Sequence, residues 1–288
     1  MPCGKASRQL SQERRLKTIL DIILEDVREE VAAAKLRHTA ADLRGMIADT
    51  PPTRDFVGAL ARSFGLIAEI KECSPSVGAM RAENVRDAAS VYSDSPIVRA
   101  VSILTNERHF GMGISRLAAM RSIMTLPLLR KDFLLDEYQV REARAFGADA
   151  ILLMANVLDA PKLAGFYDLA QELGMQALFE VHTAEEIEML PPTARVVGIN
   201  SRKFQSDKGF VGASGRSEKD FSVDFSVFEL AEKLPAGTIK VAESGIEPRT
   251  LDAVRENFHA ALVGTALLRD PRGIAACLAD FESAITGN

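Results

Sequence analysis

Several charged side chains stand at the ends of short apolar runs in this sequence. The clearest example is the segment 127–129, which leads directly into Arg130, Lys131 and Asp132. Lysine is almost never fully buried without a partner, because removing water from its charge is costly. Lys131 therefore either begins a solvated loop or is a cation placed for chemistry on a ligand. The other runs of this kind lead to Glu69 and Lys71, to Glu180, to Asn200 and Arg202, and to Glu243 and Ser244.

The spacing of these polar residues suggests that they converge. Glu69 and Lys71 are two positions apart, so on a strand their side chains point to the same side. In a parallel barrel the carboxyl ends of all strands meet at one mouth, where barrel enzymes carry their active sites. Carboxylates and cations gathered there tune each other's pKa and supply both a proton donor and a proton acceptor. An ion-pair network that only closes the mouth is the alternative, and we favour catalysis because five strands share the pattern.

The elements that must position these residues follow a repeated pattern. Eight apolar runs alternate with helical segments, which is typical of βα units and a parallel sheet. We therefore predict an α/β fold, a (β/α)₈ TIM barrel. A doubly wound open sheet is the alternative, but no run is followed by a G-x-G-x-x-G loop. The predicted strands are residues 66–71, 99–104, 127–131, 149–154, 176–181, 195–200, 238–243 and 260–264.

Helices are expected before and between these strands. Apolar positions with helical spacing predict an amphipathic helix over residues 16–34. Thr39 with Asp42 forms a capping-box pattern that starts a second helix, which Pro51 and Pro52 stop, and a third covers 55–61. Between the strands, three signals mark the ends of helices: Asp159 before Pro161 at a helix start, Gly174 after a helix end, and Thr183 with Glu186 as a capping box. We predict an N-terminal helical extension (1–64) packed on a catalytic barrel (65–288).

Composition limits the compartment and the partners. The chain has 288 residues, 47% of them hydrophobic, and a formal net charge of −5. This charge argues against a nucleic-acid or anionic-membrane surface, but leaves a small phosphorylated ligand open. Three widely spaced cysteines fit a reducing compartment, so we expect a cytoplasmic protein. We find no apolar run of membrane-spanning length, and residues 1–15 lack the apolar segment of a signal peptide.

Small residues after the last two strands predict a phosphate site. Ser244 and Gly245 follow the seventh strand, and Gly264 and Thr265 follow the eighth, where barrels commonly bind phosphate. Residues 74–76, Ser-Pro-Ser after the first strand, either close over the same ligand or form a turn, and we favour the turn.

Other candidate groups are weaker. The four histidines lack metal-ligand spacing, so no metal site is expected. His182 either orients Glu180 or is a surface histidine, and we favour the surface. Cys73 is expected to be a packing residue rather than a nucleophile, because no histidine adjoins it in sequence. The insertion 206–220, rich in Gly, Ser and charge, is either a lid over the active site or a segment without function.

Six motifs in this order resemble those of the indole-3-glycerol phosphate synthases of tryptophan biosynthesis. They cover essentially the whole barrel, and the N-terminal helices resemble that family's extension. The motifs are Ile67-Ala68-Glu69-Ile70-Lys71 with Ser74-Pro75-Ser76, Leu128-Leu129-Arg130-Lys131-Asp132-Phe133, Phe179-Glu180-Val181-His182, Gly198-Ile199-Asn200-Ser201-Arg202, Ala242-Glu243-Ser244-Gly245-Ile246, and Val263-Gly264.

The resemblance implies a decarboxylating lyase that needs no cofactor. It closes the ring of 1-(2-carboxyphenylamino)-1-deoxyribulose 5-phosphate with loss of carbon dioxide and water. By the resemblance, Lys131 is the general acid at the ketose carbonyl, and Glu180 is the carboxylate at the ring nitrogen. Lys71 meets the substrate carboxylate and, with Glu69, serves the later dehydration. The remaining implied roles are substrate contacts: Asn200, Arg202 and Glu243 at the ribulose portion, Ser74, Gly245, Gly264 and Thr265 around the phosphate, and Phe110 and Phe133 beside the anthranilate ring.

The chain departs from the family pattern at several positions. Val77 stands where the family usually has Lys, Asn106 replaces a customary Asp, Thr265 replaces Ser, and the 206–220 insertion is long. None of these changes removes a proposed acid or base, so they affect affinity, loop motion and rate rather than reaction type.

Two other functions remain as alternatives. One is a phosphoribosylanthranilate isomerase. That family has a Cys-Gly pair at the end of strand one, whereas strand one of this chain ends in Lys71-Glu72-Cys73-Ser74. The other is a non-catalytic barrel that binds a phosphorylated anthranilate or serves as a scaffold. We expect a monomer or weak homodimer, with association with other tryptophan-pathway enzymes left open.

Overall fold

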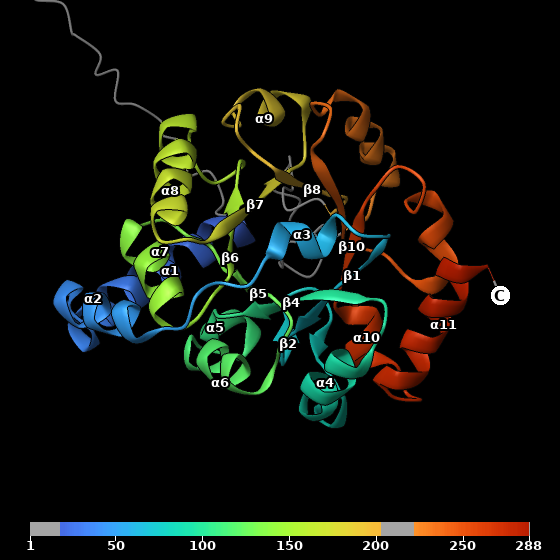
Figure 1. The fold of residues 1–288 in the computed structure, drawn as a ribbon, viewed down its shortest axis with the longest axis horizontal. Helices are drawn as coiled ribbons and strands as arrows, with labels where there is room; N and C mark the ends of the chain where they lie inside the picture. Colours follow the sequence, from blue (N-terminus) through green and yellow to red (C-terminus); the bar gives the residue numbers. More distant parts are fainter. Residues whose placement is uncertain (1–17, 203–221, 288) are drawn as a thin grey trace, which may run out of the picture.

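Short apolar runs form the strands of a closed barrel in the computed structural model, which describes residues 18–202 and 222–287. Eight parallel strands pair in chain order, and the first closes against the last (Figure 1). The predicted (β/α)₈ barrel is thereby confirmed. Its strands are β1 (Gly65–Ile70), β4 (Val98–Leu104), β5 (Leu128–Lys131), β6 (Ala150–Met154), β7 (Gln176–Val181), β8 (Val196–Asn200), β9 (Ile239–Glu243) and β10 (Ala260–Val263).

A small hairpin follows the first barrel strand. Strands β2 (Cys73–Ser74) and β3 (Gly78–Ala79) pair antiparallel, and residues 75–77 form the turn between them. The turn that we favoured for Ser-Pro-Ser is therefore present. The segment lies at the mouth of the barrel, because it begins directly after the carboxyl end of β1.

Helices surround the strands in Figure 1 and complete the second layer of the fold. They are α1 (Ile19–Arg37), α2 (Ala40–Asp49), α3 (Phe56–Leu60), α4 (Ala82–Asp94), α5 (Glu107–Phe110), α6 (Ser115–Ile123), α7 (Glu137–Ala145), α8 (Ala160–Glu172), α9 (Ala184–Glu188), α10 (Thr265–Arg269) and α11 (Ile274–Thr286). After β8 and β9 the described connections contain 3₁₀ helices, η1 (Phe225–Lys233) and η2 (Pro248–Ala253), in place of the α-helices expected from the repeat. Within the described residues, no helix has both the length and the apolar character that crossing a membrane requires.

Capping residues set the beginnings of most of these helices. Thr39 and Asp42 form the predicted reciprocal capping box of α2, and Asp159 caps α8 with Pro161 in its first turn. The expected capping box at α9 is only half present. Thr183 accepts the backbone N–H of Glu186, but the Glu186 carboxylate accepts the N–H of His182, one residue further back.

Two apolar clusters occupy the two faces of the barrel. Leu66, Ala68 and Ile70 of β1 belong to the cluster between strands and outer helices, whereas Ile67 belongs to the cluster inside the barrel. Because side chains alternate along a strand, Glu69 shares the inner face with Ile67. The same two-residue step leads from Leu129 to Lys131, from Leu178 to Glu180 and from Val241 to Glu243. The interior apolar core therefore ends in charged side chains at the carboxyl ends of the strands.

The N-terminal helices contribute to the interior cluster as well. Phe56, Val57 and Leu60 of α3 are buried in it, and α3 lies across the strands in Figure 1. Ile23 and Val27 of α1 are each 1% exposed and belong to the same cluster. Helices α1 to α3 are thus integrated with the barrel core.

Candidate active site

A cavity of about 760 Å³ opens at the carboxyl ends of the barrel strands. Residues from all eight barrel strands line it, together with the loops directly after several of them, and α1 adds one side chain. The fourteen residues singled out from the sequence all lie on its wall: Glu69, Lys71, Ser74, Phe110, Lys131, Phe133, Glu180, Asn200, Arg202, Glu243, Ser244, Gly245, Gly264 and Thr265.

Lys131 reaches from β5 toward two carboxylates on the opposite part of the barrel. Its Nζ lies 3.4 Å from Oε2 of Glu180 on β7 and 3.7 Å from Oε2 of Glu243 on β9. The side chains of Glu180 and Glu243 are each 1% exposed, and that of Lys131 is 17% exposed. The ammonium group is thus the shared counter-ion of two buried carboxylates and remains accessible from the cavity.

This arrangement separates the pKa values of the three groups. Burial disfavours the charged form of Lys131, but Glu180, Glu243 and Glu69 outweigh it and raise the lysine pKa. Burial also opposes the charge on Glu180, but Lys131 and His182 outweigh it and lower the pKa of that carboxyl group. Burial and repulsion by Glu180 raise the pKa of Glu243 well above its usual range. Lys131 and Glu243 therefore hold their protons more strongly than the isolated side chains do, and Glu180 holds its proton less strongly.

Glu69 and Lys71 form a second ion pair on the same wall. Lys71 Nζ donates to Glu69 Oε1 at 2.5 Å, which agrees with the same-side placement expected from their spacing. The Tyr92 hydroxyl of α4 donates to the backbone carbonyl of Glu69 and supports this end of β1 from outside the barrel. The pair faces the cavity beside the Lys131 cluster.

Two glycines make room for the carboxylates. A Cβ at Gly264 would overlap Oε1 of Glu69, and a Cβ at Gly198 would overlap Oε1 of Glu243. Gly264 therefore has a steric role in addition to its expected place near phosphate. Gly198 was not singled out from the sequence as a site residue. The signal available there was a glycine inside a strand, which often marks a close approach of other groups.

The loop after β9 has an uncommon backbone conformation at two consecutive residues. Ser244 has a φ of 70° and Gly245 a φ of 71°, both in the left-handed region. A non-glycine residue in this conformation costs about 1–3 kcal/mol, and such strain clusters at functional sites. The Ser201 hydroxyl donates to the carbonyls of Glu243 and Ser244 and holds the loop in place.

The other predicted phosphate residues lie on neighbouring loops. Ser74 Oγ accepts the backbone N–H of Val77 and contacts Ser76 Oγ, so it is held within the β2–β3 hairpin. Thr265 begins α10 directly after Gly264. These residues and the Ser244–Gly245 backbone line one end of the cavity.

Asn200 at the end of β8 and Arg202 just after it lie directly before the undescribed segment. Asn200 Oδ1 accepts the backbone N–H of Arg202, and both side chains line the cavity. The insertion 206–220 lies outside the described residues, so its assignment as a lid stays a prediction.

Apolar side chains line the cavity on the side of β4 to β6, across the barrel from β9, β10 and β1. Phe110 and Phe133 lie here as expected, together with Leu152 and Met154 of β6. Ile23 of α1 also lines the cavity. No sequence pattern indicated this, because its position in the helical stripe is that of an ordinary core residue.

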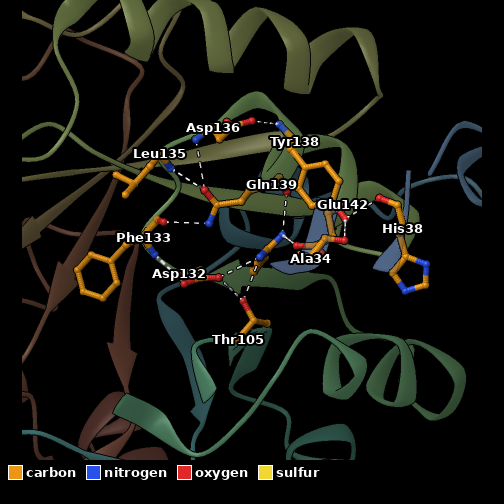
Figure 2. Close-up of polar contacts among 11 residues, drawn as sticks. Ala34, His38, Thr105, Asp132, Phe133, Leu135, Asp136, Tyr138, Gln139 and Glu142 are labelled. Carbon is orange, nitrogen blue, oxygen red and sulfur yellow. Dashed lines mark hydrogen bonds and ion pairs between the residues drawn. The ribbon is translucent and has the colours of Figure 1, made fainter. Parts of the chain in front are cut away.

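A buried network behind Lys131 fixes the loop between β5 and α7. The Arg130 guanidinium is paired with Asp132 at 2.9 Å and with Glu142 at 3.0 Å, and it donates to the Thr105 hydroxyl and the Gln139 carbonyl (Figure 2). The side chains of Arg130, Asp132, Gln139 and Glu142 are each at most 5% exposed. Such a network stabilises one arrangement only when every member is satisfied.

The same network holds the backbone on either side of Phe133. Asp132 Oδ1 accepts the Phe133 N–H, and Gln139 Nε2 donates to the Phe133 carbonyl. Gln139 Oε1 accepts the N–H of Leu135, as Figure 2 shows. The loop that carries Phe133 into the cavity is therefore fixed by side chains that never reach the cavity, apart from Asp132.

Helix α1 is attached to the mouth by polar contacts. Asp26 pairs with Arg108 at 2.7 Å and with His109 at 2.8 Å, so α1 is tied to α5, which carries Phe110. Asn106 caps α5 and donates its amide to Glu30 of α1 at 3.2 Å. Asn106 is thus used here as a donor to a carboxylate, a role that an ionised Asp cannot fill.

His182 is not the surface residue that we favoured. Its side chain is 15% exposed and lies between two carboxylates, with Nε2 3.7 Å from Glu180 Oε1 and Nδ1 3.4 Å from Glu186 Oε2. The reason is the tight turn after β7, where Glu186 binds the backbone of His182 and draws the ring toward the barrel. Cys73, by contrast, is a partly buried thiol whose Sγ donates to a backbone carbonyl, and burial raises its pKa.

Comparison with solved structures finds the same fold in other proteins. The 3-hexulose-6-phosphate synthase from Salmonella typhimurium aligns over 78% of this chain and 99% of its own, with a TM-score of 0.55 and 13% identity. KGPDC from Streptococcus mutans aligns over the same shares, with a TM-score of 0.52 and 11% identity. At these identities the likeness concerns the fold alone.

Sequence relatives are much more similar. Indole-3-glycerol phosphate synthase from Kineococcus radiotolerans is 38% identical over 275 residues, which are 91% of this chain and 94% of that protein. The protein of the same name from Mycobacterium avium is 37% identical over 279 residues, which are 93% and 95% of the two chains. The model of the family described as indole-3-glycerol phosphate synthase matches residues 20–276. The chain therefore belongs to the indole-3-glycerol phosphate synthase family, lyases of tryptophan biosynthesis.

Proposed function

We propose that the cavity closes the indole ring with Lys131 as the proton donor. The substrate is 1-(2-carboxyphenylamino)-1-deoxyribulose 5-phosphate, whose ketose carbonyl is attacked by the ring carbon that bears the carboxylate. The attack places negative charge on the carbonyl oxygen, which needs a proton, and positive charge on the ring nitrogen. The observation that carries the proposal is the accessible Lys131 ammonium held between the Glu180 and Glu243 carboxyl groups.

Glu180 has the opposite role in the first step. A carboxylate whose pKa is lowered stays ionised at neutral pH and stabilises the positive charge that develops at the ring nitrogen. Carbon dioxide then leaves, and the electron pair of the broken carbon–carbon bond restores the aromatic ring. The burial of the two carboxyl groups keeps this charge interaction strong, because water is largely excluded.

The Glu69–Lys71 pair is suited to the second step, the dehydration. Lys71 donates a proton to the departing hydroxyl group, which leaves as water. Glu69 accepts the proton that is lost from the carbon beside the nitrogen. The two groups are hydrogen-bonded to each other and face the same cavity. A proton can therefore pass from Glu69 back to Lys71 after the dehydration, which regenerates the ion pair.

The ends of the cavity match the two ends of this substrate. Phe110 and Phe133, with Leu152 and Met154, offer an apolar wall to the anthranilate ring. Ser74, Ser244, Gly245, Gly264 and Thr265 offer hydroxyl and backbone N–H donors to the phosphate. Asn200, Arg202 and Glu243 also line the cavity, and we assign them to the ribulose hydroxyl groups.

Finer points of organisation are also part of the proposal. We propose that residues 1–64 form an extension of a barrel that comprises 65–288, supported by the shared interior cluster of α1, α3 and the strands. A cytoplasmic enzyme that is a monomer or weak homodimer fits the composition. Association with other tryptophan-pathway enzymes is compatible with the sequence, and light scattering of the pure chain measures the oligomeric state.

The test is direct. The purified full chain is incubated with the carboxyphenylamino-deoxyribulose phosphate, and indole fluorescence is followed together with release of carbon dioxide. We expect both to rise in equal amounts. Absence of an indole signal from folded protein with intact substrate would refute the proposed reaction for this cavity.

A further inference from the structure

His182 lies directly behind the carboxylate that the proposed reaction needs. Glu180 divides its two oxygens between different cations: Oε2 faces Lys131 at 3.4 Å, and Oε1 faces His182 Nε2 at 3.7 Å. Among the described residues, Oε1 is buried and has no hydrogen-bond partner. A buried carboxylate oxygen without a partner is costly, and a cation at this distance offsets part of that cost.

A second carboxylate holds the imidazole from the other side. Glu186 Oε2 lies 3.4 Å from His182 Nδ1 and also accepts the His182 backbone N–H at 2.6 Å. Glu186 is itself placed by the first turn of α9, where its own N–H is capped by Thr183. The ring is therefore enclosed by a carboxylate from α9 on one side and the reacting carboxylate of β7 on the other.

We propose that His182 is a positioning residue for the synthase reaction: its imidazolium, held by Glu186, fixes Oε1 of Glu180 and keeps Glu180 ionised while Oε2 stays with Lys131. The inference rests on the role proposed for Glu180 and extends it to residues outside the cavity wall. His182 and Glu186 do not line the cavity.

The charges around these groups agree in sign. Burial opposes the imidazolium, but Glu186 and Glu180 outweigh it and raise the pKa of His182, while Lys131 of β5 acts against it. Glu180 is faced by Lys131, by His182 and by the carboxyl group of Glu243 on β9. Without the imidazolium, Glu180 loses one of its two cations, while its burial still disfavours the charged form. Its proton affinity must then increase.

The test uses two charge-removing variants and one control on the full chain. His182→Gln removes the charge but keeps an amide donor, and Glu186→Gln keeps the ring and weakens its hold. Glu185→Gln, one residue away on the exposed face of α9, is the matched control. For each, kcat/KM is measured from about pH 5 to about pH 9, since its pH profile reports the essential acid and base of the free enzyme.

We expect the acidic limb of the His182→Gln profile to move to higher pH by roughly one to three units, the effect of removing one neighbouring charge. Glu186→Gln should shift it less and in the same direction, and Glu185→Gln should match the parent. An unchanged limb overturns the proposal, including the case in which all rates fall equally, which is the signature of a structural role. If the parent itself forms no indole, the reaction assignment fails instead.

A second measurement does not depend on activity. Coupling between two sites is reciprocal, so replacing Glu180 by Gln must lower the pKa of His182. NMR titration of the His182 ring protons in the parent and in Glu180→Gln measures this change. We expect the parent value to lie above the usual histidine range of about 6.5 and to fall in the variant. Equal titration in the two proteins overturns the proposal even if His182→Gln fails to fold.

Discussion

Replacing Lys131 by Met removes the shared counter-ion of Glu180 and Glu243 while keeping an unbranched side chain of similar length. In the parent protein, Lys131 and His182 hold the pKa of Glu180 below its usual value against the effect of burial. Without the ammonium, burial raises that pKa above its value in the unfolded chain. The variant therefore has two buried carboxyl groups that both favour the protonated form.

The change reverses the pH dependence that Glu180 contributes to folding. In the parent, its lowered pKa stabilises the folded state above the unfolded pKa, and this contribution is lost as pH falls through the folded pKa. In the variant, the raised pKa stabilises the folded state below the unfolded pKa, about 4.3 for glutamate. That contribution is then lost as pH rises toward the folded pKa.

The magnitude follows from one extra bound proton. Between the unfolded and folded pKa of Glu180, the folded variant holds about one more proton than the unfolded chain, so its free energy of unfolding decreases by about 1.4 kcal/mol per pH unit relative to the parent. Glu243 has a raised pKa already in the parent, so its contribution keeps the same sign in both proteins. Urea unfolding at a series of pH values measures the difference in slope.

Turnover gives a second readout for the same variant. Loss of a positioned general acid should lower kcat by about two to four orders of magnitude, as followed by indole fluorescence. Lys162→Met, on the exposed face of α8, is the control and should change neither property. A variant at position 131 with the parent's turnover, or with the parent's dependence of stability on pH, would refute the assignment of Lys131 as donor and shared counter-ion.

Three further substitutions test the supporting structure. Gly198→Ala should lower kcat and cost about 1–3 kcal/mol of stability, measured by urea unfolding, because the new Cβ overlaps a site carboxylate. Asp132→Ala should cost about 3–5 kcal/mol, because it leaves the buried Arg130 guanidinium with an incomplete set of partners. Asn106→Asp should lower the melting temperature at neutral pH, and less so at acidic pH, because the new carboxylate faces Glu30, whose pKa is already raised by burial.

The first two of these substitutions have a matched comparison. Gly165→Ala lies on α8 with open space around the new Cβ, so it should be neutral or stabilising. Glu83→Ala removes an exposed partner of Arg81 and should change stability by less than about 1 kcal/mol. Equal effects of the buried and exposed changes in either pair, or an Asn106→Asp protein that melts like the parent at every pH, would contradict the packing described for the site.

The fold followed from local patterns in the sequence. Apolar runs of strand length alternated with capped helices, and the predicted strands agree with the observed ones to within one residue at each end. Side-chain alternation then fixed which face each polar residue occupies: Glu180 stands two positions after Leu178, which is buried inside the barrel. Strand direction placed these residues at the same mouth. Such information is local, so it can be obtained without knowing how the strands pack.

Distances across the barrel were decided only by the tertiary structure. Lys131 and Glu180 are separated by 49 positions, and no local pattern states that the ammonium lies between Glu180 and Glu243 rather than beside Glu69. The raised pKa of Glu243 depends on this packing, because it follows from burial and from the distance to its neighbours. The apolar stripe of α1 likewise predicted a buried face, but not that Ile23 lines the cavity.

His182 shows the same division. Its type and its place after a strand were visible in the sequence, and a histidine there is usually solvated. The ring is buried between Glu180 and Glu186 because the α9 capping contact reaches His182 instead of Thr183. The sequence alone determined which residue types stand at the barrel mouth and on which face of each strand. The closed barrel decided which charges neutralise each other, because electrostatic interaction depends on separation in space and on exclusion of water.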